Sequence, residues 1–251
     1  MRRILLVTAY DGTSYCGFQI QNNGITIQGI LNETLSEWLC EEIKTAGASR
    51  TDAGVHSRCN VVVFDTGSKI PGEKYAFGLN ARLPEDIRIR YSCEVPLDFN
   101  PRAAKTVKTY CYRIQNGPFQ DPIIRNNHYF CHWKLDIDRM RAAAKDLVGT
   151  HDFESFAAVG RSSPTTIRTI YDIKVEKEGE ILTITVTGDG FLYNMVRIIA
   201  GTLMEIGKGN LPADAVPDML KAKNRDASGP TAPACGLTLE RIEYPDYEFD
   251  Y

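Results

Sequence analysis

The sequence contains no apolar run long enough to cross a bilayer. A membrane-spanning helix needs about 20 consecutive apolar residues, and no stretch of the 251-residue chain approaches this length. Residues 1–10 combine a basic start with an apolar run, but that run is too short for the core of a signal peptide and leads into a predicted strand. We therefore expect a cytoplasmic protein without a membrane partner.

Paired cysteines and metal-ligand spacings are also missing. The seven cysteines are scattered, odd in number and without a C-x-x-C pair, so the chain has no recognisable disulfide framework or zinc motif. His128 and His132 lie on a segment that favours a strand, where they would share a face without a third ligand. His151 and Asp152 precede two phenylalanines, a pattern more typical of a capping turn than of a metal or triad pair.

The chain has no excess of positive charge either. Its net charge is −3, which argues weakly against a nucleic-acid partner. The distribution differs from the total, because four bases and a single acid lie between residues 98 and 113. These bases are Arg102, Lys105, Lys108 and Arg113. Charge alone leaves two interpretations open, a local basic surface and a solvated face of mixed charge.

Hydrophobic periodicity predicts an α+β fold in which the element order β-α-β-β-α-β occurs twice. Strands are expected at residues 3–10, just before 50, at 59–66 and at 87–91, with helices at 27–43 and 71–81. The second series has strands at 106–115, 167–176, 181–187 and 236–244, and helices from 136 or 138 to 148, at 191–206 and at 212–223. Each half resembles a ferredoxin-like unit. The predicted subdomains are residues 1–103, with a candidate catalytic loop, and 104–251, with a tyrosine strand and a buried helix.

Asp52 is the first candidate for chemistry. It lies in the loop ASRTDAGVHS, residues 48–57, between two predicted strands, and loops held by strands often carry catalytic groups. Local sequence alone favours a turn residue that bonds its own backbone. However, Arg50 and His56 flank it at short range. A nearby arginine favours the ionised carboxylate, which acts as a nucleophile or base without a metal.

Arg197 is the second candidate. The helix predicted at 191–206 is apolar on most of its circumference and should be buried. Arg197 is its only cation before Lys208, and a buried arginine needs a partner because an unpaired buried charge is costly. Asp52 is the predicted partner. A different carboxylate of the core, or an exit of the side chain to solvent, stays open as an alternative.

Tyr110 and Tyr112 share one face of the strand predicted at 106–115. An aromatic side chain within a basic stretch is typical of a platform on which a nucleic-acid base stacks. A core or cross-strand tyrosine is the alternative, and it is the preferred interpretation for Tyr112.

Several motifs taken together resemble those of one family. They are YDGT at residues 10–13, GFQ at 17–19, RTDAGVH at 50–56, KTYCYR at 108–113 and FLYNMVR at 191–197. In this order, and over essentially the whole chain, they are similar to the bacterial tRNA pseudouridine synthase A family.

The resemblance implies two ferredoxin-like subdomains that share a mixed sheet around a basic cleft, in a homodimer without cofactor or metal. It implies isomerisation of uridine to pseudouridine at positions 38, 39 and 40, in the anticodon stem-loop of tRNA. Asp52 matches the catalytic aspartate, and Tyr110 matches the tyrosine that packs on the uracil. Arg50 and Arg197 match arginines of the site.

His56 lies in the RTDAGVH motif, and Arg102 keeps its arginine although Asn100-Pro101-Arg102 replaces the family's more usual His-Ala-Arg. We expect both residues to contact the substrate. The chain departs from the family pattern where Ser49 replaces glycine, Phe18 replaces tryptophan and Asp189 replaces asparagine. None of these departures removes a catalytic group, so they leave room for a different preference among the three uridines.

Two other functions fit parts of the pattern. A non-catalytic RNA-binding protein of the same fold would need the basic stretch and Tyr110 but not Asp52. A metal-dependent hydrolase would use Asp52, His56, His151 and Asp152. Both explain fewer residues than the whole-chain resemblance does.

Overall fold

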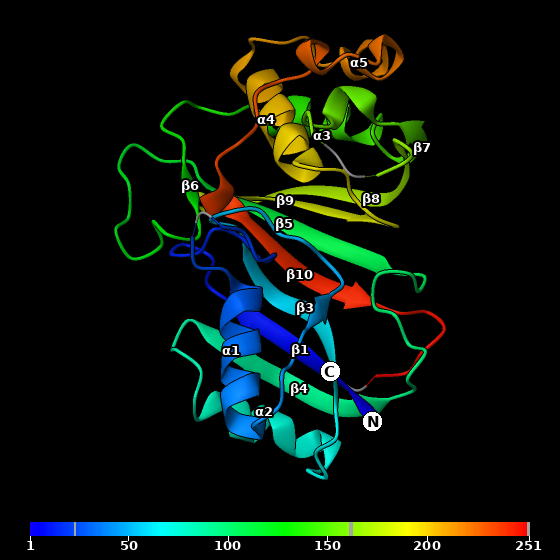
Figure 1. The fold of residues 1–251 in the computed structure, drawn as a ribbon. Helices are drawn as coiled ribbons and strands as arrows, with labels where there is room; N and C mark the ends of the chain where they lie inside the picture. The colour runs from blue at the N-terminus through cyan, green and yellow to red at the C-terminus, as the bar shows by residue number, and fades with distance from the viewer. Residues whose placement is uncertain (23, 161–162, 250–251) are drawn as a thin grey trace. The chain divides into compact units, whose positions relative to one another are not determined.

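The structure, a computed structural model, describes residues 1–22, 24–160 and 163–249. Over these residues the chain forms ten strands of mixed β-sheet and five α-helices (Figure 1), which confirms the predicted α+β class. Internal contacts define two units. The first holds Met1–Thr106 and the chain from Leu239 onward, and the second holds Val107–Thr238. Along the described chain, no helix is both long and apolar enough to traverse a bilayer.

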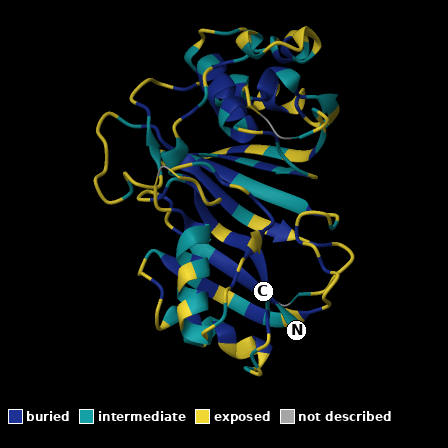
Figure 2. Ribbon diagram, viewed as in Figure 1, coloured by how far each residue is buried: buried dark blue, intermediate teal, exposed yellow. Residues whose placement is uncertain are grey.

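The first unit follows the order β-α-β-β-α-β. Its elements are β1 (Arg2–Tyr10), α1 (Ile27–Leu39), β2 (Ala46–Gly47), β3 (His56–Thr66), α2 (Tyr75–Asn80) and β4 (Ile87–Val95). β1 lies between β4 and β3 and pairs antiparallel with both, and the short β2 pairs with β3. Figure 2 shows buried residues along β1 and β3, which agrees with their apolar runs.

Helix α1 has a defined start and a defined end. The Thr26 side chain caps it by accepting a hydrogen bond from the Gly29 amide at 3.2 Å. The helix ends at Leu39, four residues earlier than predicted, because Cys40 adopts a left-handed backbone conformation with a φ of 53°. The buried face of α1 packs on the apolar side chains of β1 and β3 to form the core of this unit.

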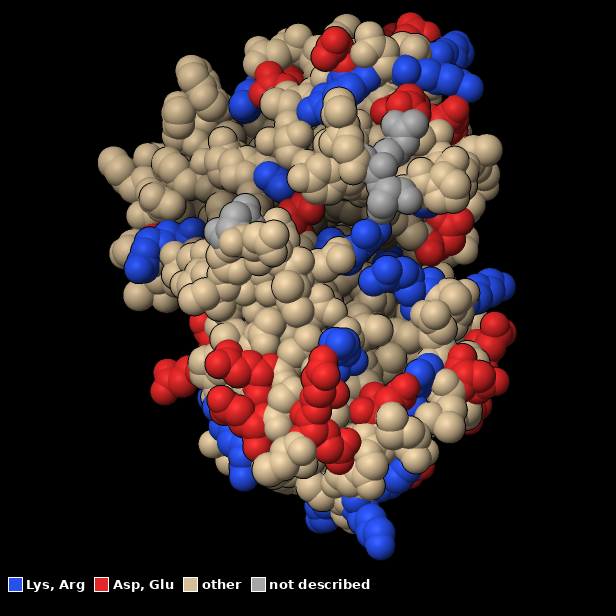
Figure 3. Space-filling view, in the orientation of Figure 1, with Lys and Arg blue, Asp and Glu red and all other residues tan. Residues whose placement is uncertain are grey.

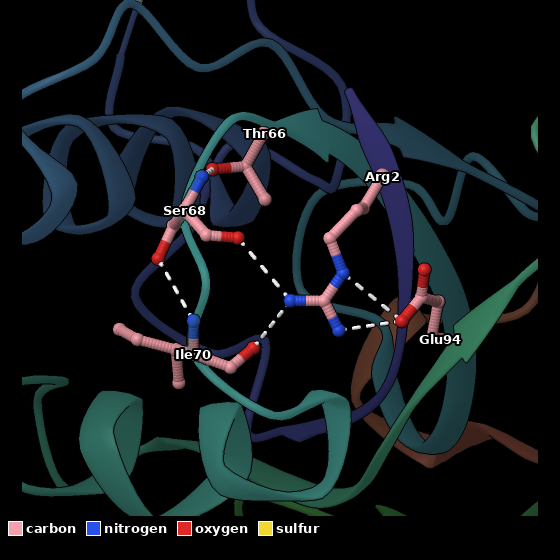
Figure 4. A network of polar contacts seen from close by, with 5 residues as sticks. All are labelled: Arg2, Thr66, Ser68, Ile70 and Glu94. Atoms are coloured by element: carbon pink, nitrogen blue, oxygen red, sulfur yellow. Dashed lines mark hydrogen bonds and ion pairs between the residues drawn. The ribbon is translucent and has the colours of Figure 1, made fainter.

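Arg2 fastens the start of β1 to β4 and to the loop after β3 (Figure 4). Its guanidinium donates to Glu94 Oε2 at 3.0 Å and to the carbonyl oxygens of Ser68 and Ile70 at 3.2 and 2.8 Å. The hydrogen bond from Arg2 lowers the pKa of the Glu94 carboxyl. Since this network lies at the end of β1 opposite to Tyr10, it serves the fold of the first unit rather than the candidate loop.

The second unit contains most of the remaining elements. They are β5 (Val107–Gln115), β6 (Tyr129–Phe130), α3 (Ile137–Lys145), β7 (Gly149–Asp152), β8 (Ile167–Glu178), β9 (Ile181–Gly188), α4 (Met195–Lys208) and α5 (Val216–Ala222). β9 pairs antiparallel with β5 and β8, β7 pairs antiparallel with β8, and β6 pairs parallel with β5. The predicted hairpin of β8 and β9 is confirmed. The last strand, β10 (Leu237–Glu243), begins in this unit and ends in the first.

Helix α4 is buried along most of its length, as its apolar circumference predicts. It begins at Met195 instead of near residue 191, because Asn194 adopts a left-handed conformation with a φ of 60° immediately before it. It ends at Lys208, and Gly209 supplies the left-handed residue that stops it, with a φ of 84°. Residues 191–194 therefore form a turn that leads from β9 into the helix.

Candidate active site

Asp52 lies in the loop between β2 and β3, and other parts of the first unit hold this loop on both sides of it. The Phe18 amide donates to the Thr51 carbonyl at 3.0 Å, and the Gly54 amide donates to the Tyr15 carbonyl at 3.3 Å. Thr51 is buried, whereas Asp52 is partly exposed. The loop therefore presents Asp52 from a fixed backbone, which is the preorganisation that a catalytic carboxylate requires.

Two glycines allow residues 12–17 to approach the loop this closely. Gly17 has a φ of 86°, and a Cβ on it would lie 2.7 Å from the Thr51 carbonyl oxygen. A Cβ on Gly12 would lie 2.0 Å from the carbonyl oxygen of Val55, whose amide closes the turn by donating to Asp52 at 3.1 Å. Any side chain at either position would displace the loop. The only sequence signal for these glycines is their place in the YDGT and GFQ motifs, which does not reveal the contacts.

A buried polar network lies beneath the loop. The hydroxyls of Tyr10 and Thr51 are 2.7 Å apart. The Asn60 amide donates to the Ser49 carbonyl at 2.9 Å and to the Tyr10 hydroxyl at 3.3 Å, and its oxygen accepts from the Ser49 amide at 3.2 Å. Burial raises the pKa of Tyr10 to about 12, so the hydroxyl stays neutral at physiological pH. The network joins β1 and β3 to the first half of the loop.

His56 is buried at the start of β3. Its Nδ1 atom accepts from the Gly12 amide at 3.1 Å and lies 3.0 Å from Asp11 Oδ1. Burial of Asp11 opposes its ionisation, but hydrogen bonds from Thr13 and the interaction with His56 outweigh this effect and lower the pKa of the Asp11 carboxyl. These contacts fasten residues 11–12 beside the loop. A contact between His56 and substrate stays a prediction.

Two arginines lie near the ends of β2 and the loop. Arg50 is exposed, two residues before Asp52. Arg102 is also exposed, and its Nη2 atom donates to the Gly47 carbonyl at 3.5 Å. The first unit thus brings Arg102, which is distant in sequence, to the strand from which the loop begins.

Negative charge gathers over helix α1 of the first unit. Figure 3 shows acidic side chains clustered over α1, where Glu33 and Glu37 are exposed. A phosphate backbone is repelled by such a surface. The surroundings of Arg50 and Arg102 are therefore better suited to nucleic acid than the outer surface of α1 is.

Tyr110 lies on β5 of the second unit and is partly buried. Its ring meets the ring of Phe191 edge to face, with centroids 5.3 Å apart and an interplanar angle of 86°. Phe191 in turn packs over Gly188, where a Cβ would lie 3.3 Å from the ring. Tyr112 is fully buried, and its hydroxyl donates to the Pro233 carbonyl at 2.9 Å. The structure therefore confirms Tyr112 as a core residue and holds the Tyr110 ring from one side.

Arg197 lies in the first turn of α4 and is held by neutral oxygens of its own unit. Its Nε atom donates to the Ala232 carbonyl at 2.8 Å, and its Nη1 atom donates to Asn194 Oδ1 at 2.9 Å. These contacts fix the position of the guanidinium. The predicted pairing of Arg197 with Asp52 joins residues of the two units and stays a prediction.

The residues considered for a metal have other partners. Asp152 lies 2.9 Å from Lys223 Nζ, and it accepts from the Thr166 hydroxyl at 2.5 Å and from the Glu154 amide at 3.2 Å. The last bond confirms the predicted capping turn, although residues 149–152 also form β7. Within the described ranges, no group of three His, Cys, Asp or Glu side chains could hold a metal ion.

The whole chain is similar to known proteins. A family model described as tRNA pseudouridine synthase matches residues 6–102 and 143–245. The tRNA pseudouridine synthase A of Geotalea uraniireducens is 48% identical over 244 residues, which cover 97% of this chain and 100% of that protein. The protein of the same name from Acetivibrio thermocellus is 43% identical over 244 residues, with the same coverage. Of the candidate residues, Tyr110 alone lies outside the ranges that the family model matches, in the segment between them.

Proposed function

The chain belongs to the tRNA pseudouridine synthase A family, a family of isomerases, and from this premise we propose that it converts uridine to pseudouridine at positions 38, 39 and 40 of the tRNA anticodon stem-loop. The observation that carries the proposal is the RTDAGVH loop. It presents a partly exposed Asp52 from a backbone that Phe18 and Tyr15 hold in place. A turn residue with only a local role would not need this support from a second segment.

We assign the chemical role to Asp52. Pseudouridine forms when the bond between C1′ and N1 breaks, the uracil rotates while it is held, and C5 bonds to C1′. A carboxylate serves this reaction by attacking C1′, by attacking C6 of the ring, or by removing a proton from the sugar. Each route needs a carboxylate at a fixed position beside the nucleotide, and none needs a metal or cofactor.

Tyr110 is proposed as the surface on which the uracil stacks. The target uridine must leave the base stack, which costs a few kcal/mol, and stacking on an aromatic ring returns about 1–3 kcal/mol. The edge-to-face contact with Phe191 supports this role because it fixes the orientation of the ring.

The arginines are proposed to act through their charge. Arg50 is exposed within the loop, and Arg102 is exposed beside β2. We assign Arg50 to the catalytic group and Arg102, together with His56, to substrate binding. Arg197, whose guanidinium the Ala232 carbonyl and Asn194 hold in place, is proposed to pair with Asp52 and keep it ionised. A charge-removing variant of Arg197 should then lower the rate more than it lowers the affinity for tRNA.

The finer form of the fold prediction belongs to the same proposal. It comprises two ferredoxin-like subdomains, residues 1–103 and 104–251, that share one mixed sheet around a basic cleft. We further propose that the protein works as a homodimer in the cytoplasm. The β-α-β-β-α-β order of the first unit supports the ferredoxin-like assignment.

The test is incubation of the purified protein with unmodified tRNA transcripts, followed by mapping of pseudouridine at each position. The proposal predicts new pseudouridine at one or more of positions 38, 39 and 40 and nowhere else. Binding without any pseudouridine would favour the non-catalytic RNA-binding alternative. Activity that a chelator abolishes and a divalent metal restores would favour metal-dependent chemistry. Against the hydrolase stands the observation that Asp152 is engaged by Lys223, Thr166 and Glu154.

A further inference from the structure

Arg168 is an arginine whose position the proposed roles leave unexplained. It lies at the start of β8, where it pairs in register with His151 of β7. Its Nη1 atom donates to the carbonyl oxygens of Thr165 and Ile167 at 3.1 and 2.5 Å, and its Nη2 atom donates to Ser163 Oγ at 2.7 Å. Three bonds thus fix the guanidinium, and all three acceptors are uncharged.

The guanidinium of Arg168 is therefore held in place by uncharged acceptors. Among the described residues, no carboxylate forms an ion pair with it. The side chain is partly buried, and burial lowers its pKa while the charge of Asp189 opposes this effect. An arginine remains cationic even so. A fixed and incompletely hydrated cation gains from an external anion, above all a phosphate.

Arg139 shows that uncharged acceptors alone do not indicate an anion site, and that the position of the arginine in the fold matters as well. Arg139 also donates only to carbonyl oxygens, those of Ile206 and Leu211. These acceptors lie at and beyond the C-terminal end of α4, about 20 Å along the helix from the turn that precedes it. Arg139 therefore ties α3 to the end of α4 and has a sufficient structural explanation.

Arg168 lies instead beside the turn that carries the partner of Tyr110. A Cβ on Gly190 would be 3.8 Å from Arg168 Nε, in ordinary contact. The neighbouring residue in the strand, Thr169, clamps the same turn, because its amide donates to Asp189 Oδ1 at 3.0 Å and its carbonyl accepts from the Asp189 amide at 3.1 Å. The residue after Gly190 is Phe191, whose ring stands edge-on against Tyr110.

This turn also bears aromatic surface beyond Phe191. Tyr193 is 49% exposed, and its carbonyl accepts from the Ala158 amide at 3.0 Å, so the segment before Arg168 is joined to the same turn. An arginine beside a turn that carries an exposed aromatic side chain is typical of a surface that binds single-stranded nucleic acid.

We propose that Arg168 binds a phosphate of the RNA strand next to the uridine that stacks on Tyr110. This inference rests on the proposed function, since it takes the Tyr110 ring as the position of the uracil. The base lies on Tyr110, the sugar passes over the Gly190 turn, and the adjoining phosphate meets the Nε and Nη2 edge of Arg168. The contact holds the strand in register and leaves the bond-breaking step to other groups.

The test compares Arg168→Gln, Arg168→Lys and a control, Lys174→Gln, in the full-length protein. Lys174 lies farther along the same strand, is exposed, and sits 3.6 Å from Asp172. Affinity for unmodified tRNA transcript is measured over a range of salt concentrations. The single-turnover rate of pseudouridine formation is measured at saturating protein, and the melting temperature of each variant is recorded.

We expect Arg168→Gln to bind tRNA about tenfold more weakly and to reduce the slope of log affinity against log salt by about 0.7, the value for one phosphate contact on a single strand. Its rate at saturation should stay within about threefold of the parent. Arg168→Lys should keep the parent slope because it keeps the charge, and Lys174→Gln should match the parent throughout.

An unchanged slope in Arg168→Gln would overturn the inference, whatever its affinity or melting temperature, because loss of a purely structural residue does not remove a phosphate contact. An equal slope change in Lys174→Gln would also overturn it, since the effect would then reflect net charge. The parent protein distinguishes a failure of the proposed function from a failure of the anion site. A parent that binds tRNA with the expected salt dependence but forms no pseudouridine would contradict the proposed function and not the anion site.

Discussion

Gly12 offers a test of how the loop positions Asp52. In Gly12→Ala the new Cβ would stand 2.0 Å from the carbonyl oxygen of Val55, whereas ordinary contacts begin near 3.4 Å. The Val55 peptide must therefore move by more than an ångström. The Val55 amide donates to the backbone carbonyl of Asp52 at 3.1 Å, so the Asp52 backbone moves with it and carries the carboxylate along. A misplacement of about 1 Å in a catalytic group costs about 100-fold in rate, and the overpacking costs about 1–3 kcal/mol of stability.

The assay is single-turnover formation of pseudouridine at saturating protein, at a temperature where every variant is folded. Gly72→Ala is the matched control, because its Cβ would lie 2.5 Å from the Glu94 amide nitrogen, in the same unit but at β4, away from the loop. Both variants should melt several degrees below the parent. Only Gly12→Ala should lose about 100-fold in rate, with tRNA affinity within about threefold of the parent. A folded Gly12→Ala with near-parent rate, or an equal loss of rate in Gly72→Ala, would refute the positioning argument.

Three further outcomes are expected. Phe191→Leu removes an edge-to-face contact worth about 0.5–1.5 kcal/mol. The single-turnover rate should therefore fall by up to about tenfold, and the free energy of unfolding should fall by no more than the energy of that contact. An unchanged rate would show that the orientation of Tyr110 does not depend on Phe191. Tyr10 has a pKa raised to about 12 in the folded state, so its contribution to stability is complete below its ordinary pKa of 10 and is lost as the pH rises from 10 to 12. Denaturant titrations at pH 9 and 11.5 should show that Tyr10→Phe loses less free energy of unfolding between these two pH values than the parent does. Equal losses would contradict the burial argument. Asn60→Ala leaves both backbone groups of Ser49 without their partner and should cost about 2–4 kcal/mol in urea unfolding; a cost below about 1 kcal/mol would mean that water replaces the amide.

The parts of the fold that depend on local pattern could be predicted from the sequence. The buried helix α4 follows from an apolar circumference, and the hairpin of β8 and β9 follows from alternation around a glycine turn. Tyr112 could be assigned to the core only because a core or cross-strand tyrosine is the commoner interpretation of such a residue, and the structure buries it fully. The first residue of α4 could not be predicted, because it depends on the left-handed conformation of Asn194.

The candidate site could be predicted only in part, because its geometry depends on contacts between distant segments. Asp52 was accessible through its motif. The close approach of Gly12 and Gly17 to the loop was not, because nothing in either segment alone specifies the other. The burial of the helix that carries Arg197 is confirmed. The acceptors at the Ala232 carbonyl and Asn194 could not be anticipated from charge complementarity.

The most direct test of the central claim is the single-turnover rate of Asp52→Asn, measured together with its affinity for tRNA. The substitution keeps the shape of the side chain and removes its charge. The account predicts tRNA binding within about threefold of the parent, an unchanged melting temperature within a few degrees, and a rate of pseudouridine formation lower by at least about 10³-fold. Pseudouridine formation by Asp52→Asn at near the parent rate would contradict the assignment of Asp52 as the catalytic residue.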